Sequence, residues 1–351
     1  MAVVLFHYDS DKSLFPVWAS SFGYSAVSFF FVLSGFILTY AHWDNRVKHG
    51  LNVAAGEFYT ARIGRIAPVY AFSLLLSAPF FVYGYLVSHQ MSGPLFLMAT
   101  ALVPLLLQAW VPPIALAWNI PAWSLSVEAF FYLMFPLMLP RLAGLRPLSV
   151  LGASIALVGA AAMARSWLRL IGPSGDRNWQ YFLDYFPLFH LPQFSLGIAI
   201  GLVFLKARKP TGMTADALAA IALAMLCFVV VQAQSHWMLS NSLLLSLVFG
   251  SLVYTLAASQ GGPVARLLSV APLVFLGQAS YAAYVLHIPI LVLWKSAAKR
   301  VDILECGPIA NFGIYIAILI GMSIATFILL ERPAKNWVLR LRFSHVDATR
   351  G

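Results

Sequence analysis

The stretch Trp123-Ser-Leu-Ser-Val-Glu-Ala-Phe-Phe-Tyr-Leu-Met-Phe-Pro136 combines an apolar helix with a single carboxylate, that of Glu128. With its apolar continuation the stretch can cross a bilayer, which takes about 20 residues of helix. A charged group at membrane depth is costly unless it is paired or faces water or substrate, and it marks a functional site by default. The stretch therefore predicts a membrane protein that performs polar chemistry within its helices.

The composition places the whole chain among polytopic helical membrane proteins. Of its 351 residues, 61% are hydrophobic and 10% are charged, whereas soluble domains carry about 25% charged residues. No stretch is polar enough to form a separate soluble domain, so we expect one membrane-embedded domain over residues 1–351 with nothing appended. The expected spans are 1–8 (partial), 22–41, 67–87, 122–139, 149–165, 187–205, 215–233, 241–258, 280–296 and 310–330.

Segment 95–121 is apolar at first, but we do not expect it to cross the bilayer. Its second part, Val111-Pro-Pro-Ile-Ala-Leu-Ala-Trp-Asn-Ile-Pro121, is too rich in proline for a regular helix. If the segment enters and leaves on one side, most Lys and Arg of the loops fall on the inner side, in line with the positive-inside tendency. We therefore predict about ten spans, cytoplasmic termini and a re-entrant or interfacial segment at 95–121. The alternative is an ordinary eleventh span with a weak charge bias.

The formal net charge of +10 has two interpretations. A basic chain can bind nucleic acid, but this chain has no compact basic module. Lys and Arg also flank membrane spans and set their orientation. We expect the second interpretation, with the lipid bilayer as a partner and no nucleic acid.

Arg62 and Arg65 form the first group of residues that suggests chemistry. Their spacing of three places both guanidinium groups on one face of a helix, at the cytoplasmic end of the predicted 67–87 span. Guanidinium groups bind phosphate oxygens in a bidentate manner. The pair therefore suits a phosphorylated ligand, although it also fits plain anchoring of a span.

Glu128 lies on one helical face with Ser124 and Tyr132, at spacings of four residues. We favour a functional role for Glu128. The alternative is a protonated carboxyl group that links two helices by a hydrogen bond.

A second polar stripe lies in the predicted 280–296 span. Ser280, Tyr284 and His287 share one helical face, and polar groups on an apolar helix face the bundle interior or a cavity. Function and hydrogen-bonded packing explain this stripe equally well.

His7 lies at the outer end of the partial first span and is followed by Tyr8 and Asp9. A neutral imidazole there can act as a general base, although a single His near a helix end is more often interfacial. His190 and Gln193 have the same ambiguity, and the following Gly197-x-x-x-Gly201 indicates close helix packing.

These motifs occur in an order that resembles acyltransferase family 3 of bacterial inner-membrane proteins, and the resemblance covers nearly the whole chain. The motifs are His7, Ser25-Ala-Val-Ser-Phe-Phe-Phe-Val-Leu-Ser-Gly-Phe36, Arg62-Ile-Gly-Arg-Ile-Ala-Pro68, Trp123-Ser-Leu-Ser-Val-Glu128 with Phe131, Tyr132 and Pro136, Ser280-Tyr281 with Tyr284 and His287, and Glu331-Arg-Pro333.

The resemblance implies transfer of an acyl group, usually acetyl, from cytoplasmic acyl-CoA to a hydroxyl of a cell-envelope polysaccharide or a small glycosylated acceptor. It implies that His7 is the catalytic base, that Arg62 and Arg65 bind the acyl donor, and that Glu128 matches the glutamate of the family's Trp-Ser-Leu-x-x-Glu element. The family also has an arginine about ten residues before the histidine, and that position would precede Met1. Met1–His7 lacks the parts of a signal peptide and resembles the end of a span whose beginning is missing.

The expected reaction needs no metal. His7, tuned by a carboxylate such as Glu128 or Asp9, would deprotonate the acceptor hydroxyl. Tyr284, His287 or Ser124 would stabilise the oxyanion, a contribution of about 3 kcal/mol per good donor. A relay through an acyl-enzyme remains open.

Two other functions compete with acyl transfer. A transporter or flippase of an acylated or glycan substrate is the main alternative, although we find no internal repeat that would support it. A non-catalytic membrane sensor would need neither the Arg pair nor Glu128. We expect the longest outer loop, 166–186, to shape the acceptor site, and its candidate residues are Arg169, Arg177, Asn178, Trp179, Tyr181 and Asp184.

Overall fold

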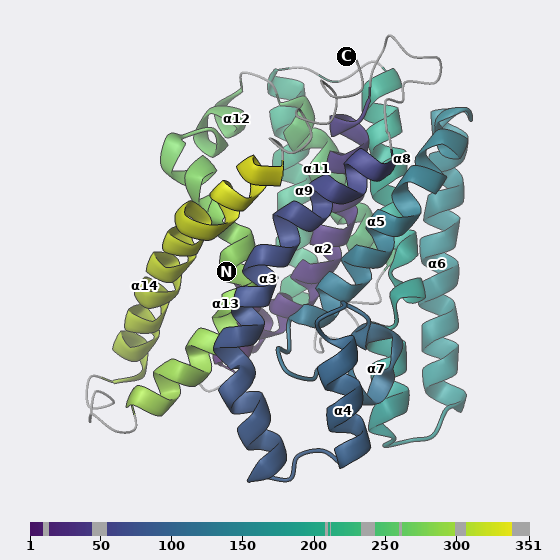
Figure 1. Ribbon diagram of the computed structural model, residues 1–351. Coiled ribbons are helices and arrows are strands. Elements are labelled where there is room, and N and C mark those ends of the chain that lie inside the picture. The colour runs from purple at the N-terminus through teal and green to yellow at the C-terminus, as the bar shows by residue number, and fades with distance from the viewer. Residues whose placement is uncertain are drawn as a thin grey trace, which may run out of the picture. The chain divides into compact units, whose positions relative to one another are not determined.

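The computed structural model describes residues 1–9, 14–43, 55–207, 210, 212–232, 243–259, 262–298 and 307–338. The regular secondary structure in these ranges is helical (Figure 1). The elements are α1 (Ala2–Tyr8), α2 (Val17–Ala41), α3 (Ala55–Leu86), α4 (Gly93–Leu102), η1 (Gln108–Trp110), η2 (Pro112–Ile114), α5 (Ala122–Ala143), α6 (Pro147–Ile171), α7 (Arg177–Tyr185), η3 (Pro187–Phe189), α8 (Leu191–Lys206), α9 (Met213–Gln232), α11 (Leu243–Ala258), α12 (Pro263–Leu268), α13 (Ala271–Ala298), α14 (Pro308–Thr326) and the π-helical turn η5 (Phe327–Glu331).

Seven helical stretches in the described part of the chain are long and apolar enough to cross a membrane. They are Ala55–Leu86, Ala122–Ala143, Pro147–Ile171, Pro187–Lys206, Met213–Val231, Ala271–Ala298 and Pro308–Val338. Each corresponds to a predicted span. The apolar helices at Ser25–Ala41 and Leu243–Ala258 are shorter, and α1 has only seven residues. The all-helical, multi-pass fold is confirmed, whereas the predicted count of ten spans is not.

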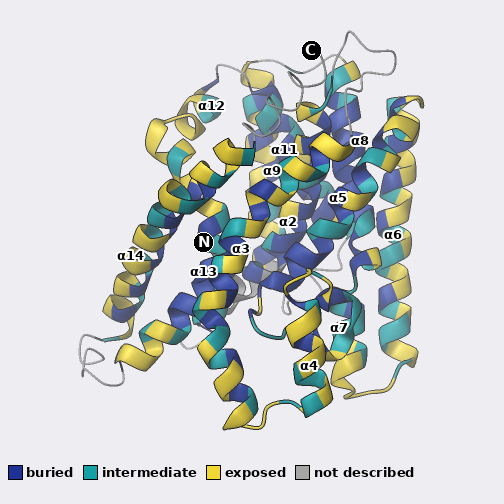
Figure 2. Ribbon diagram, in the orientation of Figure 1, coloured by how far each residue is buried: buried dark blue, intermediate teal, exposed yellow. Residues whose placement is uncertain are grey.

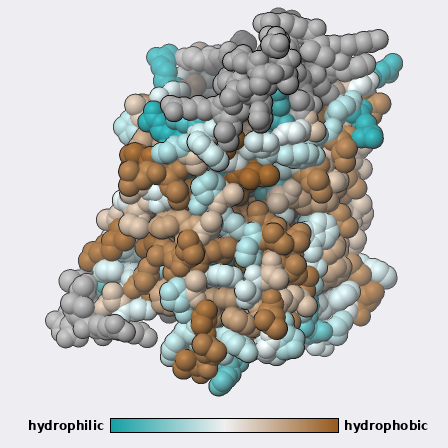
Figure 3. All heavy atoms as spheres, viewed as in Figure 1, coloured by the Kyte–Doolittle hydropathy of each residue, from teal (hydrophilic) through white to brown (hydrophobic). Residues whose placement is uncertain are grey.

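The chain forms two compact units. The first unit consists of Met1–Val53 and Val127–Ala271, and the second consists of Ala54–Ser126 and Pro272–Gly351. Large apolar side chains are exposed in both units, with Leu75, Leu170 and Leu329 each more than two-thirds exposed. Hydrophobic residues, in brown, cover much of the face seen in Figure 3. Extensive apolar exposure of this kind marks a surface that contacts membrane.

In the first unit, α2 and α8 pack with their backbones in direct contact. A Cβ atom on Gly197 would lie 2.0 Å from the carbonyl oxygen of Val32, and one on Gly35 would lie 2.2 Å from that of Phe194. Only glycine allows such an approach, so the close packing predicted for Gly197-x-x-x-Gly201 is confirmed. The packed helix α8 is buried along most of its length, whereas α6 is largely exposed (Figure 2).

In the second unit, the proline-rich segment 95–121 lacks a long helix. Helix α4 has ten residues and rises about 15 Å, half of the ~30 Å that a span requires. The rest is irregular and is fixed by tertiary hydrogen bonds: Gln108 Nε2 donates to Ala122 O at 2.9 Å, and Trp118 Nε1 donates to Leu74 O at 3.0 Å. Irregular backbone within a membrane requires such internal partners. The re-entrant or interfacial position of the segment in a bilayer stays a prediction.

Candidate functional site

Glu128 is held by two hydroxyl groups of the first unit. Tyr132 Oη donates to Glu128 Oε1 at 2.5 Å, and Ser34 Oγ lies 3.5 Å from the same oxygen. Helix α5 brings Tyr132 beside Glu128 because residues four apart share a helical face. The structure thus unites Glu128 and Tyr132 as the spacing predicted. Sequence reasoning missed Ser34, whose partner lies 94 residues away, although the Ser25–Phe36 motif contains it.

Ser124 forms its hydrogen bonds within the second unit. Its Oγ lies 2.6 Å from Tyr284 Oη and 3.0 Å from Pro121 O, and Tyr284 Oη lies 3.2 Å from Pro121 O. Each hydroxyl has one proton, so one hydroxyl donates to the other, which donates to the carbonyl. The two hydroxyls and one carbonyl form a cluster at the start of α5. The sequence had assigned Ser124 and Tyr284 to separate stripes, and the structure brings them together.

His287 is fully buried on α13. Its Nδ1 lies 2.5 Å from Tyr284 O, and its own carbonyl accepts a hydrogen bond of 2.9 Å from Tyr315 Oη. Because a carbonyl oxygen can only accept, Nδ1 carries a proton, and the neutral tautomer with this hydrogen bond has its lone pair on Nε2. Ser280, the third member of the predicted stripe, is exposed and donates to Gly277 O in its own helix.

His7 has the same tautomer in the first unit. Its Nδ1 lies 2.9 Å from Val3 O, one turn earlier on α1, so Nδ1 donates and Nε2 keeps its lone pair. Asp9 is 2% exposed, and its carboxylate accepts the backbone N–H groups of Leu14 at 3.0 Å and Phe15 at 2.9 Å. Asp9 therefore binds the backbone at Leu14 and Phe15, a role the sequence did not reveal.

Arg62 and Arg65 lie on α3 in the second unit, three residues apart as predicted. The Arg62 guanidinium lies 5.8 Å from the ring centre of Phe58, and its side chain is half-buried, whereas Arg65 is exposed. The charges of Arg65 and Lys335 act on the carboxylate of Glu331, which is 6% exposed at the end of the π-helical turn. The sequence did not predict the proximity of Glu331 to Arg65.

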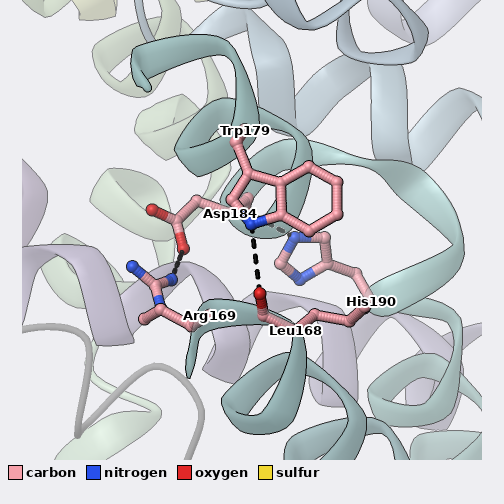
Figure 4. A network of polar contacts seen from close by, with 5 residues as sticks. All are labelled: Leu168, Arg169, Trp179, Asp184 and His190. Carbon is pink, nitrogen blue, oxygen red and sulfur yellow. Dashed lines mark hydrogen bonds and ion pairs between the residues drawn. The ribbon is translucent and has the colours of Figure 1, made fainter. Parts of the chain in front are cut away.

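The loop between α6 and α8 is fixed by a polar network in the first unit (Figure 4). Arg169 Nη2 and Asp184 Oδ1 form an ion pair at 2.5 Å, and Trp179 Nε1 donates to Leu168 O at 3.1 Å. His190, which is buried, donates from Nε2 to Asp184 O at 2.9 Å. The structure thus brings together three of the residues expected to shape the acceptor site, and it gives His190 a structural role.

Tyr185 ends α7 beside this network. Burial raises the pKa of its phenol, and the charges of Asp184 and Tyr181 raise it further. Tyr185 therefore keeps its proton at neutral pH and remains a hydrogen-bond donor.

The predicted site residues divide between the two units. His7 and Glu128 belong to the first unit, and Arg62, Arg65, Tyr284 and His287 belong to the second. Within the described ranges, no group of three or more His, Cys, Asp and Glu side chains could hold a metal ion.

Apolar helices of spanning length, with a hydrogen-bonded carboxylate inside one of them, define a multi-pass membrane protein. A family model described as "Acyltransferase domain" matches residues 1–331. Because the match covers most of the chain, the chain belongs to this family, acyltransferase family 3.

Comparison with curated proteins also finds an acyltransferase that is similar to this chain. The chain is 30% identical over 195 residues to Acyltransferase MdmB of Streptomyces mycarofaciens. The match covers 52% of this chain and 47% of that protein, so it spans about half the length of the relative. No solved structure matches the chain.

Proposed function

We propose that this protein is a membrane O-acyltransferase of the bacterial inner membrane. It moves an acyl group, specifically acetyl, from cytoplasmic acyl-CoA to a hydroxyl of a cell-envelope polysaccharide or another glycosylated acceptor. The observation that carries the proposal is the family match, which covers every residue to which we assign chemistry.

His7 acts as the general base in this proposal. The hydrogen bond from Nδ1 to Val3 O directs the lone pair of Nε2 away from the helix backbone, and Nε2 takes the proton of the acceptor hydroxyl. The alkoxide oxygen attacks the thioester carbonyl carbon, the carbon–sulfur bond breaks, and the departing thiolate receives the proton from the imidazolium. General-base assistance of this kind contributes about 10²–10⁴-fold to the rate.

Glu128 supplies the negative charge of the site. Tyr132 and Ser34 hold its carboxylate, and an oriented carboxylate stabilises an imidazolium or accepts a hydrogen bond from the acceptor. Such preorganised charge is effective because it needs no rearrangement during the reaction.

Two arginines of the second unit are the donor-binding residues of the proposal. Arg62 and Arg65 bind the CoA phosphates, because two guanidinium groups on one face can each contact phosphate oxygens in a bidentate manner. Tyr284 stabilises the oxyanion of the tetrahedral intermediate, and His287 supports Tyr284, because its Nδ1 proton is directed at the Tyr284 carbonyl. The Ser124–Tyr284 hydrogen bond of 2.6 Å supports this role, because it fixes the phenol in one orientation.

Acetyl transfer in inverted membrane vesicles tests the proposal. Vesicles that contain the protein and host glycans receive radiolabelled acetyl-CoA, and the label in the glycan fraction is measured. We expect labelling with the wild type, loss of labelling with Glu128→Gln, and wild-type labelling with Glu57→Gln, a change of the same kind at an exposed position of α3. Wild-type protein that is folded but transfers no label would contradict acetyl-CoA as the donor, and an active Glu128→Gln variant would contradict the role of Glu128.

A further inference from the structure

The first unit contains a cavity of about 580 Å³ between α6, α8, α9 and α11. Its walls are mainly aliphatic, and they include Leu151, Ile155, Ile200, Ile221, Met225 and Leu247. The volume falls in the range of ligand-binding sites, about 300–1,000 Å³. The functional site described above makes no use of this cavity.

The walls offer few partners for a polar ligand. Among the described residues no charged side chain lines the cavity, and the oxygen-bearing side chains of its wall are Ser251, Tyr254 and Thr255. Ser251 Oγ donates to Leu247 O at 2.9 Å, and Thr255 Oγ1 donates to Ser251 O at 2.8 Å. Because these two hydroxyls already donate within their own helix, a polar group that entered the cavity would replace few of the hydrogen bonds that it makes with water. The chemistry of the walls fits a hydrocarbon chain.

The surroundings of the cavity supply such chains. Helices α6, α8 and α9 contain three of the stretches that are able to span a membrane, and α11 is a shorter apolar helix. Ile221 is 56% exposed and Met225 is 46% exposed, so the cavity is open along α9 and a chain can enter from the side. The hydrocarbon present at this depth of a bilayer is the acyl chain of a lipid.

Two cations lie beyond one end of the cavity. Lys206 follows the wall residue Val203 by three residues, about 4.5 Å along α8, and Arg146 precedes Leu151 by five residues, about 7.5 Å along α6. Lys206 Nζ donates to Ala143 O at 2.7 Å, which links the end of α8 to the segment that carries Arg146. A lipid phosphate at this end would meet positive charge while its chain lies in the cavity.

We propose that this cavity is a binding site for one acyl chain of a membrane phospholipid, with the phosphate of that lipid beside Arg146 and Lys206. A bound acyl chain would contact α6 and α9, which are mostly exposed, and also the buried helix α8. This inference does not depend on the acyltransferase function.

Photolabelling of the full chain in nanodiscs tests the site. The probe is phosphatidylglycerol with a diazirine on one acyl chain, and labelled peptides are located by mass spectrometry. We expect labels on the peptides of α9 and α11 that line the cavity. Met225→Trp places a large ring in the opening and should reduce this labelling about tenfold, the factor that corresponds to 1.4 kcal/mol. Leu223→Trp is the matched control, because Leu223 is 52% exposed on the same helix and does not line the cavity.

A second variant covers the case in which Met225→Trp does not fold. Ile221→Trp then replaces it, since Ile221 also lines the opening and is exposed. Equal labelling of the wild type and the cavity variant overturns the site. A long-chain acyl-CoA with the same diazirine forms a second arm, and labelling of the cavity by this probe but not by the phospholipid assigns the cavity to the acyl donor and overturns the lipid.

Discussion

The phenol of Tyr132 donates a hydrogen bond of 2.5 Å to the carboxylate of Glu128, one turn earlier on α5. A carboxylate has about four lone-pair sites, so Glu128 can accept this bond and the contact from Ser34 and still accept a hydrogen bond from a substrate. Tyr132 therefore orients the carboxyl group of Glu128.

Removal of the Tyr132 hydroxyl should lower acyl transfer without unfolding the protein. A hydrogen bond to a charged group contributes about 1.5–3 kcal/mol, so we expect Tyr132→Phe to reduce kcat/KM by roughly tenfold to a hundredfold. The control is Tyr83→Phe, because Tyr83 is 59% exposed on α3. Both variants are compared by transfer rate and by thermal unfolding in detergent, and equal rates would show that Tyr132 does not position Glu128.

Replacement of His7 should abolish transfer if its Nε2 is the base. We expect His7→Asn to lose about 10²–10⁴-fold in rate and to reach wild-type levels in the membrane, since His7 is only half-buried. His89→Asn is the control: His89 is exposed and has a φ of 48°, a conformation that Asn tolerates. Retained activity of His7→Asn would assign the base to another group.

The Arg pair should affect the donor rather than the chemical step. Lysine keeps the charge of Arg62 and Arg65 but cannot form bidentate contacts, so Arg62→Lys and Arg65→Lys should each raise the KM for acyl-CoA several-fold and leave kcat nearly unchanged. Arg141→Lys serves as the control, because Arg141 is exposed near the end of α5. An unchanged KM in both variants would favour the interpretation that the pair only anchors a span.

The features that the sequence predicted correctly are those set by local geometry. The Glu128–Tyr132 contact and the close approach at Gly197 follow from helical spacing, and the irregular course of segment 95–121 follows from its prolines. Each can be inferred from residues that lie close together in the sequence. The family resemblance was also confirmed, because it depends on the order of motifs along the sequence and not on packing between distant segments.

The features that the sequence did not predict depend on packing between distant segments. Ser34 meets Glu128 from 94 residues away, and Ser124 meets Tyr284 from 160 residues away. Asp9 had been a candidate for tuning His7, but its carboxylate accepts the N–H groups of Leu14 and Phe15, a contact that no periodicity reveals. The count of spans was uncertain for a related reason: hydropathy marks apolar segments, whereas their helical length depends on where neighbouring helices and loops allow the backbone to continue.

Substitution of glycine by alanine should have opposite effects at Gly197, where α2 and α8 are in contact, and at Gly152, inside α6. A Cβ atom on Gly197 would lie 2.0 Å from Val32 O, which is backbone and cannot move aside alone. Gly197→Ala should therefore separate the two helices and lower the free energy of unfolding by about 1–3 kcal/mol. Gly152 lies inside α6 with nothing within 4 Å of an added Cβ atom, so Gly152→Ala should raise stability by up to about 1 kcal/mol through the better helix propensity of alanine. Thermal unfolding in detergent measures both, and a Gly197→Ala variant as stable as Gly152→Ala would contradict the close approach of α2 and α8.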